Sequence, residues 1–168
     1  PGLHIYLFEA NQEMAAESSH GWNNAGTGHA GICELSYTPT RNAKGSVDVT
    51  KAIEIFEQFE HSKQFWAHGV ANGLLKNPRS FINALPHLSF VHGEAQVDFL
   101  RARYAALSAH HFFSSMEFST DHGRIGSWAP LLTKSRDPNQ LIAATRMLNG
   151  TDVNFGEIAQ QLVGWLGQ

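Results

Sequence analysis

Residues 10–48 are rich in glycine, asparagine, serine and threonine and show no helical or strand period, and this long loop limits what the chain can fold into. The run LHIYLF before it, ending at Glu9, predicts a largely buried strand closed by a carboxylate. Thr50 after it caps a strongly amphipathic helix. We therefore expect a strand, a long loop and a helix in this order, without a regular alternation of strands and helices.

The loop contains Gly26, Gly28 and Gly31 at the spacing G-x-G-x-x-G, which is the pattern of dinucleotide-binding loops. Such a loop needs a buried strand before its first glycine and a helix N-terminus after its last one. Residues 18–25 do not have a strand pattern, and residues 32–38 are poor helix formers that lead into Pro39. We expect a turn whose backbone N–H groups approach a ligand, or a loop that only turns, rather than a Rossmann phosphate loop.

The rest of the chain mixes helices and strands irregularly. The first helix ends at Gly73 and Asn77-Pro78, and further helices are expected at 94–109, near Pro130, and after a capping box formed by Asn154 and Glu157. Strands are expected at 80–83, 87–92 and 141–147. The predicted fold class is therefore α+β, not doubly wound α/β.

The composition excludes several classes of protein. The 168 residues suffice for one domain with a core, and the net charge of −3, without a run of Lys or Arg, argues against nucleic-acid binding. Cys33 is the only cysteine, so no internal disulfide is expected. We also expect the protein to lie in a reducing compartment. No apolar run reaches the roughly 18 residues of a membrane span. No two of the ten histidines have the spacing of a zinc site, so no metal is expected.

Several long blocks, in order along nearly the whole chain, closely resemble the FAD-dependent malate:quinone oxidoreductases. These blocks, with x for a position that does not count, are SSxxWNNAGTGH at 18–29, ELxYTP at 34–39, QFW at 64–66, NPRSFIN at 77–83, PHxSFV at 86–91, MEFS at 116–119, WAPLL at 128–132, AATR at 143–146 and GTDVNFG at 150–156.

The resemblance implies a larger protein in which a Rossmann-type FAD domain is interleaved with a mixed sheet-plus-helix substrate domain, and of which this chain is an internal fragment. Residues 1–48 would be the FAD-domain remnant, from its second strand, together with the flavin loop. Residues 49–150 would belong to the substrate domain, and residues 151–168 would form a helix returning toward the FAD domain. Because the glycine fingerprint of that domain is missing here, FAD binding is expected of the parent protein and is doubtful for this chain alone.

The resemblance also assigns site residues. Glu9 would hold the adenosine ribose of FAD, whose pyrophosphate and flavin would be lined by Ser18, Ser19, Asn23, Asn24, Ala25, Gly26, Thr27 and Gly28. Arg79 and Arg146 would clamp the carboxylates of malate, with His87 also in the substrate site. His29 would be the base that takes the hydroxyl proton. The alternatives are structural salt bridges for the arginines and a loop-shaping role for His29.

The reaction that the resemblance implies is the oxidation of malate at its C2 hydroxyl, with electrons passing through FAD to a membrane quinone. We therefore expect a cytoplasmic protein that lies peripherally on the inner face of the cell membrane. Two alternatives stay open. One is an FAD-dependent enzyme for another 2-hydroxy acid. The other is a non-catalytic domain that self-associates through an exposed strand edge.

Overall fold

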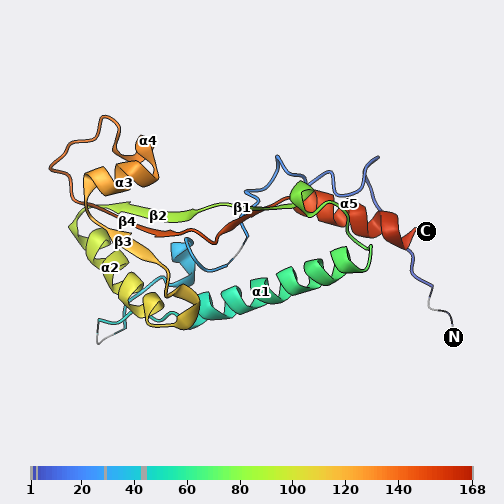
Figure 1. Ribbon diagram of the computed structural model, residues 1–168, viewed down its shortest axis with the longest axis horizontal. Helices are drawn as coiled ribbons and strands as arrows, with labels where there is room; N and C mark the ends of the chain where they lie inside the picture. The colour runs from blue at the N-terminus through green and yellow to red at the C-terminus, as the bar shows by residue number, and fades with distance from the viewer. Residues whose placement is uncertain (1, 3, 29, 43–44, 168) are drawn as a thin grey trace. The chain divides into compact units, whose positions relative to one another are not determined.

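The computed structural model describes residue 2 and residues 4–28, 30–42 and 45–167, and Figure 1 shows their helices and strands. The chain divides into two compact units. The first comprises Pro1–Thr27, Gln64–Asn83 and Asp152–Gln168, and the second comprises Gly28–Lys63 and Ala84–Thr151. The long helix α1 (Thr50–Ala71) contributes residues to both units.

The second unit is built on a three-stranded antiparallel sheet with the order β2-β4-β3. The strands are β2 (His87–His92), β3 (Glu117–Ser119) and β4 (Ile142–Met147). The central strand β4 is buried at every position except Arg146, which is half-buried, because helices cover both faces of the sheet.

The two faces of this sheet carry different clusters. On one face, Val97 and Leu100 of α2 (Glu94–Ser108) pack with Val91 and Ala143. On the other face, Ile125 of α3 (His122–Trp128) packs with the strand residues Ile142 and Ala144, and Leu132 of α4 (Pro130–Thr133) lies against the same cluster. Figure 1 shows α2 on one side of the sheet and α3 with α4 on the other.

Aromatic rings pack together within the second unit, near the beginning of α1. The ring of Phe56 on α1 stacks on Phe112 at a centroid distance of 4.7 Å and meets Phe113 edge-on at 5.2 Å. Phe112 and Phe113 belong to the 3-10 helix η3 (His111–Phe113). A further 3-10 helix, η1 (Leu35–Tyr37), lies in the segment before α1.

The first unit contains the C-terminal helix α5 (Phe155–Leu166) and the 3-10 helix η2 (Pro78–Ser80). Asn154 caps α5, because its side chain accepts a hydrogen bond from the backbone N–H of Glu157 at 3.1 Å. The strands β1 (Ile82–Ala84) and β5 (Thr151–Val153) form a two-stranded sheet, of which residues 82, 83, 152 and 153 belong to the first unit. Trp66 at the end of α1 meets Phe81 edge-on.

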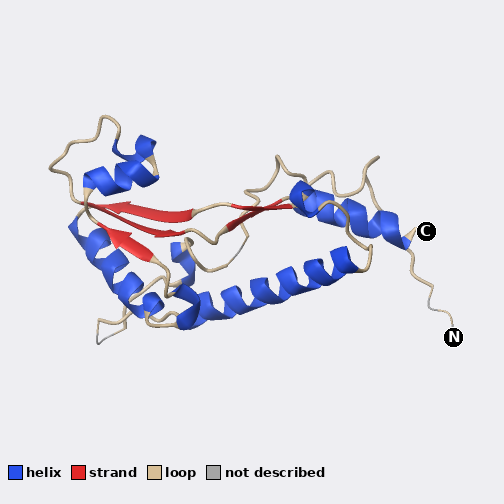
Figure 2. Cartoon of the chain, viewed as in Figure 1, coloured by secondary structure: helices blue, strands red, loops and turns tan. Residues whose placement is uncertain are grey.

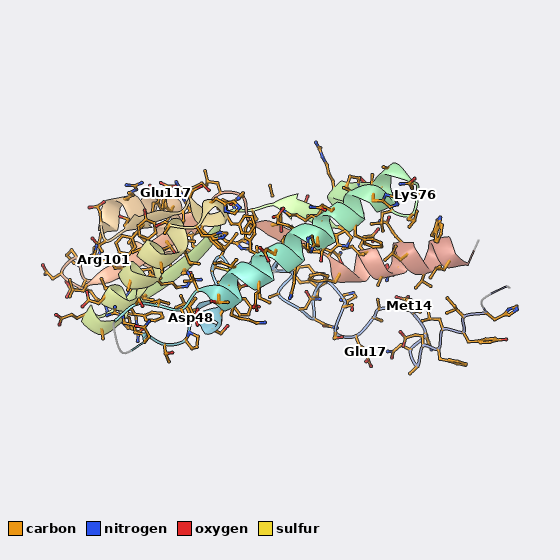
Figure 3. All side chains as sticks on the ribbon, turned by 90° about the horizontal axis from the view of Figure 1, so that it is seen from below. Met14, Glu17, Asp48, Lys76, Arg101 and Glu117 are labelled. Atoms are coloured by element: carbon orange, nitrogen blue, oxygen red, sulfur yellow. The ribbon has the colours of Figure 1, made fainter. Side chains whose placement is uncertain are left out.

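Most predicted elements are present. The helix from Thr50, the strand 87–92, the helix from Glu94, the strand before Met147 and the capping box at Asn154 are confirmed to within one residue. The helix α1 begins at Thr50 itself, whose N–H donates to Oδ1 of Asp48 at 2.9 Å (Figure 3). The strand expected at 80–83 begins at Ile82, because Pro78–Ser80 forms the 3-10 turn η2. The sequence did not indicate β3 and β5.

The predicted N-terminal strand is wrong for its described residues. Residues 4–9 form no strand, and Figure 2 draws this part of the chain as loop. The side chains of Ile5 and Phe8 are 72% and 91% exposed. A strand needs a neighbour for its backbone N–H and C=O groups, and no described strand pairs with this run.

The mixed α+β class is confirmed, whereas the Rossmann-type FAD domain stays a prediction. The predicted segments 1–48, 49–150 and 151–168 describe roles within a longer protein, and the two units do not test them. No described helix combines the length and apolar character that crossing a membrane requires.

Candidate functional site

The predicted flavin loop is held in shape by its two asparagines. The side-chain amide of Asn23 donates to the carbonyl oxygen of Glu17 at 3.0 Å, and that of Asn24 donates to the carbonyl oxygen of Ser18 at 3.0 Å. The Asn24 side-chain oxygen also accepts from the N–H of Gly26 at 2.8 Å, which is an Asx turn. These contacts give both asparagines a structural role within the loop.

Gly26 fastens the loop to β5. Its carbonyl accepts from the N–H of Val153 at 2.6 Å, and Thr27 forms an antiparallel bridge with Asp152. Gly26 has a φ of +62°, and a Cβ added there would lie 2.6 Å from Oδ1 of Asp152. Only glycine adopts this backbone without strain while leaving room for the neighbouring strand.

The other two glycines of the motif also approach protein atoms closely. The N–H of Gly28 donates to the carbonyl oxygen of Thr151 at 3.0 Å, and a Cβ there would meet the Phe59 ring at 2.5 Å. Gly31, at a φ of +65°, packs on the backbone of Ala52 in α1. The next described element is the 3-10 helix η1, not an α-helix. The motif is therefore not a Rossmann phosphate loop, and its glycines are required by packing.

A pocket of about 410 Å³ lies beside the loop within the first unit. It is lined by Gly21, Trp22, Ala25, Gly26, Ser80, Asn83, Asp152, Val153 and Asn154. The Trp22 side chain is 93% exposed, so an aromatic face stands next to backbone that carries almost no side chain. Polar groups of Ser80, Asn83 and Asp152 complete the lining, which is the mixture typical of small-molecule sites.

Sequence reasoning placed only Ala25 and Gly26 of this lining in the site. Trp22, Ser80, Asn83 and Asp152 were not assigned. The available signal was their position: Trp22 lies inside the block 18–29, and Asp152 lies inside the block 150–156. What the sequence could not show is the bridge between Thr27 and Asp152, which brings these two blocks together.

Glu9 lies in the exposed N-terminal run. Its Oε1 accepts from the backbone N–H of Asn11 at 3.0 Å, and this hydrogen bond lowers the pKa of the Glu9 carboxyl. The ribose-binding acid of a Rossmann domain stands at the end of a buried strand, and no such strand precedes Glu9 among the described residues. The role of Glu9 at the ribose of FAD therefore stays a prediction.

The two candidate malate-binding arginines have different surroundings. Arg79 is exposed on η2 in the first unit. Arg146 is on β4 in the second unit, and its Nε and Nη2 donate to Oε1 of Glu117 at 3.0 and 2.6 Å. The Arg146 guanidinium also lies 4.6 Å from the ring centre of Trp128. Arg146 thus already binds a carboxylate of its own chain.

His87 is buried, and both of its ring nitrogens have partners. Nε2 lies 3.1 Å from the carbonyl oxygen of Thr151, and Nδ1 lies 3.7 Å from Sγ of Cys33. Nε2–H must donate to the carbonyl, so Nδ1 of a neutral ring accepts from the Cys33 thiol. Such a histidine supports the packing of the core.

The structure does not bring His87 and Arg146 together. His87 is opposite Met147 in the β2–β4 register, and Arg146 is opposite Leu88. Paired residues share a face of the sheet and successive residues alternate, so His87 and Arg146 lie on opposite faces. One ligand cannot contact both side chains across this sheet.

Arg103 is a buried, hydrogen-bonded cation that the sequence reasoning missed. It is fully buried on α2, and its guanidinium donates to the segment 31–38 that follows the loop. The available signal was that this charged residue directly precedes Tyr104. Tyr104 was predicted to point inward together with Val97, Leu100 and Leu107. The Tyr104 ring is instead partly exposed and stacks on Phe118.

His29, the predicted base, lies outside the described residues. Among the residues that the structure does describe, no group of three or more His, Cys, Asp or Glu side chains is arranged to hold a metal ion.

A family model described as "Malate:quinone oxidoreductase (Mqo)" matches residues 1–168, the whole of the chain. The match therefore includes both the loop with its pocket and the sheet that carries Arg146 and His87. It confirms the resemblance that the sequence blocks indicated. The chain belongs to the malate:quinone oxidoreductase family.

Proposed function

We propose that this chain is a segment of an FAD-dependent enzyme that oxidises malate to oxaloacetate and passes the electrons to a membrane quinone. The observation that carries this proposal is the family match over all 168 residues, supported by a pocket beside the predicted flavin loop. When bound, the flavin supplies the redox chemistry by accepting the two electrons that malate loses at C2.

The pocket beside the loop fits part of a flavin nucleotide. Gly21, Ala25 and Gly26 present backbone that a ligand can approach closely, and Trp22 offers an exposed ring for contact with a planar group. Ser80 and Asn83 supply hydrogen-bonding groups from the opposite segment. We assign these residues to holding the flavin ring system, and Glu9 stays the proposed contact of the adenosine ribose on the basis of the sequence resemblance alone.

Malate is a dianion, so its site needs cationic donors. The exposed Arg79 is open to a carboxylate, whereas Arg146 binds one only in competition with Glu117. We therefore propose Arg79 as the favoured malate-binding residue, and we keep Arg146 as a candidate on the basis of the sequence alone. A substitution Arg79→Gln is expected to raise the KM for malate about tenfold or more, because a charge-assisted hydrogen bond is lost.

The proton of the C2 hydroxyl needs an acceptor whose pKa is near the working pH. We keep His29 in this role on the basis of the sequence alone. His87 stays a proposed residue of the substrate side. Because both of its ring nitrogens already have partners, we propose that it acts there only through its contact with Thr151. His29→Gln is expected to lower kcat and leave the visible flavin spectrum unchanged.

A second candidate function applies to the isolated chain. The side chains of Ile5, Tyr6, Leu7 and Phe8 are all more than half exposed. Four consecutive exposed apolar residues with unpaired backbone form a template for pairing with another strand. The isolated chain is therefore expected to self-associate through this run, without catalysis.

The test is to purify the intact gene product and this chain side by side. Visible flavin absorbance in the intact product, with malate-dependent reduction of a quinone analogue, supports the proposed function. A colourless intact product overturns it. Turnover of a different 2-hydroxy acid, with no turnover of malate, overturns the substrate assignment. Binding to vesicles that contain quinone tests the proposed peripheral contact with a membrane, and an intact product that stays unbound contradicts this contact.

A further inference from the structure

We infer that Arg103 is a positioning residue: it holds segment 31–38, and through it the adjoining loop that we propose to border the flavin. The inference has two halves: that Arg103 holds the segment, and that the segment positions the loop beside the flavin. Only the second, the cofactor half, rests on the proposed function. Arg103 is on α2 of the second unit, and its side chain is completely buried.

The guanidinium is matched to the backbone around it. Nη1 donates to the carbonyl oxygen of Ile32 at 3.1 Å, and Nη2 donates to the carbonyl oxygens of Gly31 and Ile32 at 3.2 and 3.1 Å. Nε donates to Oγ1 of Thr38 at 2.8 Å. A planar fork with five N–H donors can bind several carbonyls at once, and a lysine ammonium cannot reproduce this geometry.

The bound segment has little regular structure of its own. Its only described element is the 3-10 helix η1 (Leu35–Tyr37), so the carbonyls of residues 31 and 32 have no ladder of helix or strand hydrogen bonds. Burying such groups without partners is costly, and Arg103 supplies the partners. Thr38 is fully buried as well, and its Oγ1 accepts from Arg103 while lying 3.3 Å from the carbonyl oxygen of Leu35.

Arg103 remains a cation in this setting. Burial lowers the pKa of its guanidinium to about 10, while the nearby acidic groups of Cys33 and Glu34 act to raise it. A pKa near this value keeps the group charged at neutral pH. The backbone carbonyls therefore stabilise a buried charge, and removal of either side leaves the other unpaired.

The segment is fixed at its N-terminal end from a second direction. Gly31, whose carbonyl binds Arg103, packs its Cα side against the backbone of Ala52 in α1. Gly28 lies three residues earlier and donates to the carbonyl oxygen of Thr151. Residues 31 and 32 are therefore held from two sides, and Gly28, close to them in the sequence, adjoins the predicted flavin loop.

The first test is hydrogen exchange on the intact gene product with Arg103→Lys and Arg103→Ala. The matched control is Arg101→Ala, since Arg101 is on the same helix but exposed, with its guanidinium over the Phe118 ring (Figure 3). We expect exchange within residues 30–38 to rise about tenfold or more in both Arg103 variants, with the strands β2 and β4 still protected. Added guanidinium ion is expected to restore protection in Arg103→Ala. Equal loss of protection throughout the second unit would show that Arg103 stabilises the core as a whole, and this result would overturn the inference.

The second test uses the intact gene product and reads the flavin rather than turnover. A displaced loop is expected to shift the visible absorbance bands and the reduction potential of the flavin in Arg103→Ala, with guanidinium reversing both changes. Exchange that rises locally while the flavin spectrum and potential stay unchanged overturns the cofactor half. A wild-type product without flavin contradicts the proposed function, and with it the part of the inference that concerns the flavin. The exchange experiment still decides whether Arg103 holds the segment.

Discussion

Arg146 and Glu117 are directly opposite each other on β4 and β3, and one carboxylate oxygen of Glu117 accepts from both Nε and Nη2 of the Arg146 guanidinium. The other carboxylate oxygen accepts from Nη2 of Arg124 at 2.7 Å. The ring of Trp128 lies beneath both guanidinium groups. A single acidic side chain therefore joins two cations at one edge of the sheet.

The Glu117 cluster predicts a pH dependence of stability. The hydrogen bonds from Arg146, and then those from Arg124, lower the pKa of Glu117. A lowered folded-state pKa stabilises the fold above the unfolded value of about 4.3, and this contribution is lost as the pH falls through the folded-state pKa. Glu117→Gln is expected to lower the free energy of unfolding at neutral pH by less than about 1 kcal/mol, because the groups are partly exposed.

Urea unfolding at several pH values checks this prediction. The difference between wild type and Glu117→Gln is expected to disappear in acid. Glu54→Gln is the control, because Glu54 and its partner Lys51 are both more than half exposed and 3.7 Å apart. A difference that persists unchanged below the folded-state pKa would contradict the assignment.

The loop glycines predict a clear pattern of stability changes. Gly26→Ala and Gly28→Ala are each expected to lower the free energy of unfolding by about 1–3 kcal/mol, because the added Cβ meets Asp152 in one case and Phe59 in the other. Gly164→Ala is the control, since this position is inside α5 and, apart from the chain neighbours and the nearby backbone of its own helix, no atom lies within 4 Å of the added Cβ. That control is expected to stabilise the chain by up to about 1 kcal/mol. Thermal unfolding distinguishes the two effects.

The Cys33 thiol is expected to be unreactive in the folded chain. Burial and then the charge of Glu34 raise its pKa to about 12, so almost no thiolate is present at neutral pH. The reaction with a thiol reagent should be roughly a thousandfold slower than in the unfolded chain, whose cysteine titrates near 8.5. Labelling with and without urea measures this ratio, and equal rates would contradict the buried position.

The same shift has a stability consequence. Because the folded-state pKa of Cys33 is above the unfolded value, its contribution is fully present below the unfolded pKa. It decreases as the pH rises from there toward the folded value, since only the unfolded chain ionises. Cys33→Ser, which does not ionise in this range, is expected to show a smaller loss of stability in alkaline solution.

The helix cap at Asn154 gives a further prediction. Its side chain accepts from the N–H of Glu157 at the start of α5. Asn154→Ala is expected to cost about 1 kcal/mol, and Asn154→Asp, which keeps an acceptor, is expected to cost much less. Helix content and thermal unfolding of the two variants test whether the cap or some other contact is responsible.

Local patterns in the sequence were sufficient for most of the fold. The capping box placed α5 correctly, and the apolar period of α2 identified Val97, Leu100 and Leu107 as buried. These predictions succeed because they depend on neighbours within one or two helical turns. The buried Arg103 was missed because its carbonyl partners lie about seventy positions earlier in the chain.

The failures share a physical cause. The N-terminal run has a strand pattern, but a strand forms only when another strand pairs with it, and its own residues do not encode that partner. His87 and Arg146 were both correctly placed on strands, yet their opposite faces follow from the β2–β4 register. The pocket beside Gly26 likewise depends on the bridge to Asp152, which no local pattern shows.

Close packing at Gly26, Gly28 and Gly31 bears on how homologous sequences are to be read. Selection for folding alone would keep these three positions as glycine. A descendant that had lost its catalytic activity would still retain the G-x-G-x-x-G signature for as long as it folded. Invariance of that signature in an alignment is therefore a marker of architecture, and enzyme identity must be judged from other columns.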